Sequence, residues 1–211
     1  MASKLEVYKD LQQRIITNDI APGESLNLKG LMEHYQIGRT PLREILRELQ
    51  RDGLIEIIPK LGTRVTLSDI HELKKIVQVR RRLEGLVGLL AAENFTREQF
   101  KKIKAMVQKI EELDPTDEDA LEMFTHYDME IHQTLYESTR NEVLTGIISQ
   151  LQKRTSKFWH QMGFTFEEFV NEVKDFKKVL DAFEKRDADR AAKALENHID
   201  HFVKKVKGHI L

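Results

Sequence analysis

Cysteine is absent from the 211-residue sequence. Its absence excludes disulfide scaffolds, thiolate zinc sites, iron–sulfur clusters and cysteine nucleophiles. No apolar run approaches the roughly 18 residues that a membrane span needs, so we expect no transmembrane helix. The N-terminal segment has no apolar stretch behind Lys4 and does not resemble a secretion signal, so we expect a cytoplasmic protein.

An excess of one charge is also missing. The sequence has 34 Lys and Arg residues against 35 Asp and Glu residues, which gives a formal net charge of −1. This balance excludes a wholly basic nucleic-acid binder but allows a local basic face. With 40% hydrophobic and 33% charged residues, the composition is that of a globular protein, and the length suits two domains.

Proline is scarce and unevenly placed, because three of the four prolines precede residue 60. The first third therefore reads as short elements separated by breaks. We predict helices over residues 5–17, 28–35 and 40–52. A β-hairpin should follow, with strands at 54–58 and 63–66 around a short tip.

The helix predicted over 40–52 has an apolar face and a basic face. Four arginines recur on the basic face at four-residue steps: Arg39, Arg43, Arg47 and Arg51. An arginine can pair bidentately with guanine or clamp a phosphate, so the stripe suits a helix that reads the major groove. Taken alone, it equally fits a solvated helix whose arginines pair with Glu44 and Glu48.

The sequence around the stripe favours DNA binding. Residues 39–64 contain six Lys or Arg residues against four acidic ones, and the hairpin tip carries Lys60 and Gly62. A helix-turn-helix followed by such a hairpin is a winged helix.

Most of residues 5–66 resemble the GntR family of bacterial transcription regulators, most clearly in the string IAPGESLNLKGLMEHYQIGRTPLREILRELQRDGLIEIIPKLGTRV. The resemblance implies DNA contacts from Arg39, Thr40, Arg43 and Arg47, and a wing tip at Gly62. One departure is Gly38, where the family usually has Ser.

From about residue 67 onward, apolar residues recur at helical spacing. We predict six helices, over residues 68–93, 96–113, 117–137, 141–161, 166–186 and 188–209. Capping boxes should mark three of the helix starts: Thr96 with Gln99, Thr116 with Asp119, and Thr165 with Glu168. Asp187 should cap the last helix. Short joints favour an antiparallel bundle.

The predicted fold is therefore mainly α. Residues 1–66 should form an N-terminal winged helix-turn-helix domain with a small β-hairpin wing. Residues 67–211 should form a C-terminal all-α antiparallel helical bundle for effector binding and dimerisation.

Asp128 and His132 lie one helical turn apart, so one metal ion could bind both side chains. On its own, an Asp-x-x-x-His pair is more often a surface pair. The segment from Leu83 to His198, however, resembles the FadR-type C-terminal ligand-sensing domain (FCD), of the shorter six-helix VanR-like type. The resemblance rests on the strings VRRRLEGLVGLLAAE, YDMEIHQTLYESTRN and VLDAFEKRDADRAAKALENHI.

In many members of that family, one Asp and three His residues bind a divalent metal, and a small carboxylate effector completes the coordination. The resemblance places Asp128, His132 and His198 on three ligand positions, but Phe176 occupies the fourth. Three ligands are few for Zn²⁺ or Ni²⁺, and oxygens from water or the effector would have to complete the shell. Other candidate ligands are Glu172, His160 and His201. Alternatively, Phe176 makes the pocket more apolar and the metal is lost.

Arg80 falls on a family pattern that implies contact with an effector carboxylate, although an ion pair between Arg80 and Glu84 would explain it equally well. The leading prediction is a homodimeric, ligand-responsive transcription regulator, a repressor that binds a palindromic DNA operator. Two alternatives stay open: a metal-dependent enzyme in the bundle, and a constitutive DNA binder with a vestigial sensor. Against an enzyme, the sequence has no nucleophile elbow, phosphate loop or HExxH motif.

Overall fold

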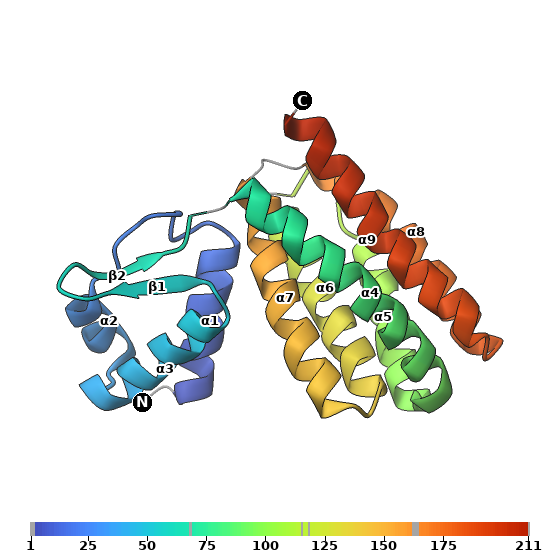
Figure 1. Ribbon diagram of the computed structural model, residues 1–211, viewed down its shortest axis with the longest axis horizontal. Helices are drawn as coiled ribbons and strands as arrows, with labels where there is room; N and C mark the ends of the chain where they lie inside the picture. Colours follow the sequence, from blue (N-terminus) through green and yellow to red (C-terminus); the bar gives the residue numbers. More distant parts are fainter. Residues whose placement is uncertain (1–2, 68, 115, 118, 162–164, 211) are drawn as a thin grey trace. The chain divides into compact units, whose positions relative to one another are not determined.

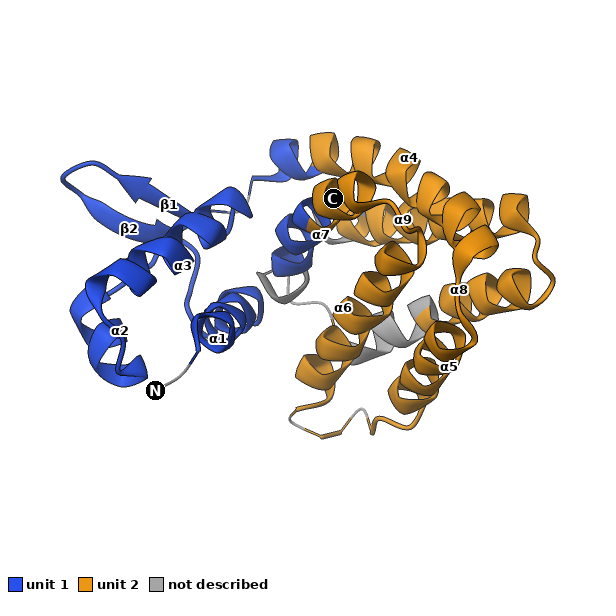
Figure 2. Cartoon of the chain, turned by 90° about the horizontal axis from the view of Figure 1, so that it is seen from below, with its two compact units in different colours: residues 1–73, 150–161 blue, residues 74–149, 162–211 orange. Residues whose placement is uncertain are grey.

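The computed structural model describes residues 3–67, 69–114, 116–117, 119–161 and 165–210. Within these, the side chains of residues 159–161, 166–172, 207, 209 and 210 are outside the description. The chain divides into two compact units, as Figure 2 shows. Unit 1 comprises residues 1–73 and 150–161, and unit 2 comprises residues 74–149 and 162–211.

Unit 1 contains the predicted winged helix. Its helices are α1 (Lys4–Ile16), α2 (Leu28–Tyr35) and α3 (Arg39–Arg51), followed by an antiparallel hairpin of β1 (Ile55–Ile58) and β2 (Gly62–Val65) (Figure 1). Each boundary lies within one residue of the sequence-based prediction.

The helix starts in unit 1 have clear chemical causes. Ser3 and Glu6 form a reciprocal capping box at α1, and the Asn27 side chain accepts a hydrogen bond from Gly30 at α2. Gly38 precedes α3 and offers no side-chain cap. The core beneath these helices includes Leu11, Ile15, Ile45 and Leu49, all fully buried.

Unit 1 also includes the second half of α7 (Glu142–Gln161). Lys153 Nζ donates to Asp52 Oδ2 and to the Tyr8 hydroxyl, at 3.0 Å each. One turn later, the buried Lys157 donates to Thr66 Oγ1 at 2.8 Å. Residues 150–161 are therefore tied to the winged helix by hydrogen bonds, although the sequence assigned them to the bundle by helical period alone.

Unit 2 consists of the remaining helices. They are α4 (Ile70–Asn94), whose first turn belongs to unit 1, α5 (Arg97–Glu111), α6 (Ala120–Ser138), the first half of α7, α8 (Phe166–Glu184) and α9 (Ala188–Ile210). Helices α5, α6 and α8 pack against one another, and α8 packs against α9. The predicted mainly α fold, with a two-stranded wing and a helical bundle, is confirmed.

Two of the predicted helix starts in unit 2 are confirmed and one is wrong. Thr96 and Gln99 form the expected capping box, and Asp187 accepts a hydrogen bond from the backbone of Arg190. The Thr116 box does not form, because α6 begins four residues later at Ala120 and the Thr116 hydroxyl donates to Asp114 at 2.7 Å. The partner proposed for Thr165, Glu168, has its side chain outside the described residues.

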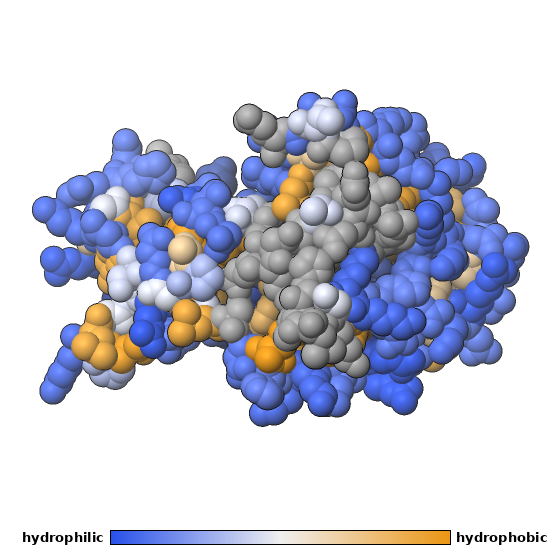
Figure 3. Space-filling view, turned by 90° about the horizontal axis from the view of Figure 1, so that it is seen from above, coloured by the Kyte–Doolittle hydropathy of each residue, from blue (hydrophilic) through white to orange (hydrophobic). Residues whose placement is uncertain are grey.

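Among the described residues, no helix is long and apolar enough to cross a membrane. The coloured part of the face drawn in Figure 3 is mostly hydrophilic, with smaller hydrophobic areas. This surface agrees with the large share of charged residues in the sequence.

Candidate DNA-reading surface and buried metal and effector site

The amphipathic division of α3 presents its arginines to solvent. Leu42, Ile45, Leu46 and Leu49 are buried, whereas Arg39, Thr40, Arg43, Arg47 and Arg51 are exposed. Because the apolar face of α3 packs into the core of unit 1, the opposite face with the arginines must point to solvent.

The proposed pairing of these arginines with Glu44 and Glu48 is absent from the described part of the chain. Both glutamates instead lie near Lys4 of α1, whose Nζ is 3.2 Å from Glu44 and 3.7 Å from Glu48. Within the described residues, no ion pair engages any arginine of the α3 stripe. The guanidiniums therefore keep their hydrogen-bond donors available for phosphates or bases.

The wing tip is a tight, exposed turn. Lys60 and Gly62 both have positive φ angles, of 66° and 112°, and both side-chain positions are open to solvent. The value at Gly62 lies in a region that favours glycine, which explains the residue at that place. Arg64 forms an ion pair with Glu56 at 2.6 Å. Lys60 is therefore the basic residue of the wing that is more available for contact with DNA.

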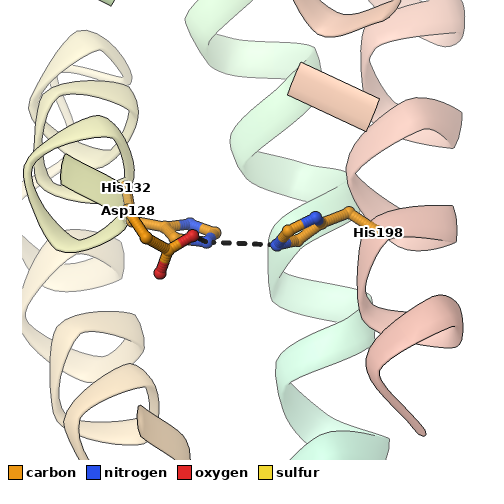
Figure 4. Close-up of side chains that lie close together, drawn as sticks. All are labelled: Asp128, His132 and His198. Atoms are coloured by element: carbon orange, nitrogen blue, oxygen red, sulfur yellow. Dashed lines mark hydrogen bonds and ion pairs between the residues drawn. The ribbon is translucent and has the colours of Figure 1, made fainter. Parts of the chain in front are cut away.

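In unit 2, Asp128 and His132 of α6 converge with His198 of α9 (Figure 4). All three side chains are buried, and their candidate donor atoms lie within 4.8 Å of one another. His132 Nε2 is 3.3 Å from His198 Nε2 and 3.7 Å from Asp128 Oδ1. The three positions that the sequence singled out are thus brought together.

These distances suit a metal site. Two nitrogens bound to one tetrahedral Zn²⁺ at about 2.0–2.1 Å lie about 3.3–3.4 Å apart, as the two imidazoles do here. Asp128 Oδ1 needs only a small movement to join them, and it has no hydrogen-bond partner among the described residues. A buried carboxylate oxygen without a partner is costly, and a cation would remove that cost.

The tautomer of His132 can be inferred from its neighbours. Arg80 has only donors, and its Nη2 lies 3.4 Å from His132 Nε2, so Nε2 is the acceptor. On the other side of the ring, the Tyr136 hydroxyl donates to Glu84 Oε1 at 2.7 Å and lies 3.2 Å from His132 Nδ1. The Nδ1 proton therefore points to Tyr136, and the lone pair of Nε2 points to the cluster.

Burial determines the charge states of the cluster. It lowers the pKa of His198 to about 3 and that of His132 well below its usual value, and the Arg80 charge acts in the same direction. Both imidazoles are therefore neutral at pH 7, which is the form that binds metals. Burial also raises the pKa of Asp128 to about 7, although Arg80 opposes this shift.

Arg80 lies inside unit 2 and forms the structural pair considered as an alternative. It is 3% exposed, and its Nη2 and Nε lie 3.0 and 3.1 Å from Glu84 Oε1. Glu84 is itself fully buried, and its pKa is raised by burial against the opposing effects of Arg80 and Tyr136. Arg80 thus pairs with Glu84 and contacts the histidine cluster as well.

Phe176 of α8 occupies the place of the fourth ligand. Its ring is buried, and its centroid is 5.4 Å from that of His132 and 4.7 Å from that of His198. Of the substitute ligands, His201 is half-exposed and bonds Asp175 at 2.5 Å. The side chains of His160 and Glu172 lie outside the described residues.

Tyr136 is the site residue that the sequence analysis missed. The available signal was its spacing, because Tyr136 follows His132 by one helical turn and so lies on the same face of α6. Nothing in the sequence indicated that Glu84, far away in the chain, would accept its hydrogen bond.

Comparisons with known proteins agree in fold and family. The family model for bacterial regulatory proteins of the gntR family matches residues 3–65, and the model for the FCD domain matches residues 75–201. YdhC, an HTH-type transcriptional regulator of Bacillus subtilis (strain 168), is 20% identical over 208 residues, covering 98% of this chain and 92% of YdhC. RspR, an HTH-type transcriptional repressor of Escherichia coli (strain K12), is 22% identical over 204 residues, covering 96% and 88%.

The solved structure of E. coli McbR/YncC has a TM-score of 0.86 and 20% identity, and the match covers 100% of both chains. This likeness shows a shared fold. The related proteins are transcription regulators and not enzymes, as the sequence predicted. Because the FCD model alone covers more than half of its length, the chain belongs to the GntR family of bacterial transcription regulators, with a winged helix followed by a FadR-type FCD domain.

Proposed function

We propose that this protein is a ligand-responsive repressor whose operator affinity changes when a small carboxylate binds in unit 2 beside a divalent metal. The observation that carries the proposal is the buried convergence of Asp128, His132 and His198 beside Arg80. The same chain carries an exposed arginine stripe on a winged helix, and no ion pair with another described residue engages it. The name of RspR as a repressor supports the direction of regulation.

DNA recognition is assigned to α3 and the wing. Arg39, Thr40, Arg43 and Arg47 would contact the major groove, because they share the exposed face of a helix whose other face is buried. Lys60, beside the open Gly62, would contact a phosphate near the wing. Because its target is chromosomal DNA, we expect the protein to act in the cytoplasm.

The metal would be held by Asp128 Oδ1, His132 Nε2 and His198 Nε2. When bound, a divalent ion such as Zn²⁺ or Ni²⁺ supplies a Lewis acid that attracts a carboxylate oxygen. The chain's own residues orient this shell. Tyr136 and Glu84 hold the His132 ring with its Nε2 lone pair toward the cluster, and Arg80, which is paired with Glu84, lies beside it.

Homodimerisation through unit 2 is supported by its exposed apolar side chains. Val79 and Leu86 lie two turns apart on α4, and Val143 and Ile147 lie one turn apart on α7. A dimer would present two recognition helices to a palindromic operator.

Operator binding by the whole protein tests the proposal. The chelator-treated protein and the Zn²⁺- or Ni²⁺-loaded protein are titrated with operator DNA at fixed salt, with and without a panel of small carboxylates. We expect at least one carboxylate to change operator affinity in the loaded protein only, and His132→Ala to abolish that response. Sequence-specific binding that neither metal nor any carboxylate alters would instead identify a constitutive binder.

A further inference from the structure

The charges buried around the cluster limit which ligand the site accepts. Arg80 and Glu84 form an ion pair at 3.0 Å and cancel each other. A bound divalent ion would have two neutral imidazoles and the ionised Asp128 carboxylate as its ligands, which leaves one net positive charge. Nearby, the buried Asp175 is already matched by Lys178 at 2.8 Å. A ligand with one negative charge would neutralise the site.

A second negative charge would find no free buried partner there among the described residues. The nearest buried cation, Arg80, already balances the charge of the fully buried Glu84 carboxylate, so it does not supply a second positive charge for the ligand. An unpaired buried charge is strongly unfavourable. The site therefore discriminates against dianions.

Phe176 adds a second constraint. Its buried ring lies against both imidazoles, with centroids 4.7 Å from His198 and 5.4 Å from His132. Where a histidine would offer a polar ring nitrogen, this ring offers only apolar surface. Polar ligand groups placed against it would lose hydrogen bonds to water and gain none.

We propose that Phe176 is a specificity-determining residue, and that the site selects monocarboxylates whose remaining part is apolar, against dicarboxylates of similar size. This inference rests on the proposed function, since it assumes that a metal and a carboxylate bind at this site. It goes further by naming the charge and the polarity of the effector.

Calorimetric titration of the full-length, Ni²⁺-loaded protein tests the proposal with three probes: butanoate, phenylacetate and succinate. We expect at least one of the two monocarboxylates to bind about tenfold or more tightly than succinate. Phe176→His should reduce this preference. Phe176→Leu, which keeps an apolar side chain, is the matched control and should retain it.

The outcomes separate the inference from the proposed function. Metal uptake is measured first, by titrating Ni²⁺ into chelator-treated protein; a chain that takes up none contradicts both. If metal binds and succinate binds as tightly as both monocarboxylates, or if neither monocarboxylate binds, the inference is wrong. An equal loss of preference in Phe176→His and Phe176→Leu would also overturn the role of apolar surface, because it would show only that the ring packs in the core.

Discussion

At the scale of single residues, the Tyr136 hydroxyl connects Glu84 to His132. It holds the His132 ring through Nδ1, the nitrogen that faces away from Asp128 and His198. It donates to Glu84 at 2.7 Å and leaves its oxygen as the acceptor for His132 Nδ1 at 3.2 Å. A histidine held in this way presents one defined nitrogen, which reduces the cost of ordering it when a metal binds.

Tyr136→Phe should therefore weaken metal binding. Loss of such a partner typically lowers metal affinity about 10–100-fold, and we expect a value in that range. Competition between the protein and a chelator of known affinity measures the change. Tyr127→Phe, outside the cluster on the same helix, is the control; equal affinities in wild type and Tyr136→Phe would refute the orienting role.

Lys157 gives a pH-dependent prediction in unit 1. It is 2% exposed, and burial together with the Arg154 charge lowers its pKa to about 8, below the usual value of 10.5. Between these two pH values the unfolded chain binds the proton and the folded chain does not. Lys157 therefore destabilises the fold at neutral pH, and this penalty is relieved as the pH rises through that interval.

Lys157→Met should accordingly raise the free energy of unfolding at pH 7, and its advantage over wild type should shrink as the pH rises from 8 to 10.5. Denaturant unfolding at several pH values measures this difference. Lys193→Met, at an exposed position on α9, should show no comparable trend. A constant difference for Lys157→Met across this range would contradict the prediction.

At the scale of elements, close helix packing in unit 2 depends on Gly88. A Cβ atom at this position of α4 would lie 2.5 Å from backbone atoms of Ala192 in α9, so the two helices would have to separate. Gly146 of α7 is the opposite case, because a Cβ there meets nothing within 4 Å.

The same substitution should therefore have opposite effects at the two glycines. Gly88→Ala should destabilise the protein by about 1–3 kcal/mol through overpacking. Gly146→Ala should stabilise it by up to about 1 kcal/mol, because alanine is the better helix former. Chemical denaturation of both variants measures the signs, and a neutral Gly88→Ala would show that α4 and α9 can adjust.

The exposed face of α3 carries the arginines that we expect to contact the operator. Arg43→Ala and Arg47→Ala should each weaken operator binding by about 1–3 kcal/mol, the value of a bidentate base contact, without changing stability. Operator titration at fixed salt measures the loss, and Lys104→Ala, an exposed basic residue of unit 2, is the control. If both arginine variants bind like wild type, α3 is not the recognition helix.

At the scale of the whole molecule, the expected assembly is a dimer formed through the exposed apolar residues of unit 2. Val143 and Ile147 are 74% and 49% exposed and lie one turn apart on α7, and exposed apolar side chains that are grouped in this way favour an interaction surface.

The double variant Val143→Glu and Ile147→Glu should sediment as a monomer. It should also bind the palindromic operator more weakly, because a monomer contacts only one half-site at a time whereas a dimer contacts both. The control is Leu5→Glu on α1, where a 61% exposed apolar side chain of unit 1 is replaced and unit 2 is unchanged. Sedimentation at several concentrations decides the matter, and a dimeric double variant would place the interface elsewhere.

The sequence by itself determined the order of the elements and, apart from the start of α6, their approximate ends, because helical period, capping residues and Pro or Gly breaks are local properties. Together with the family motifs, it also identified the arginine stripe and the three candidate metal ligands. Only the tertiary structure decided which side chains form ion pairs and hydrogen bonds with one another. Glu44 and Glu48 pair with Lys4, and residues 150–161 bond to the winged helix. Arg80, Glu84 and Tyr136 form one network around His132. Such contacts join residues far apart in the chain, and their geometry is set by packing, which no local pattern records.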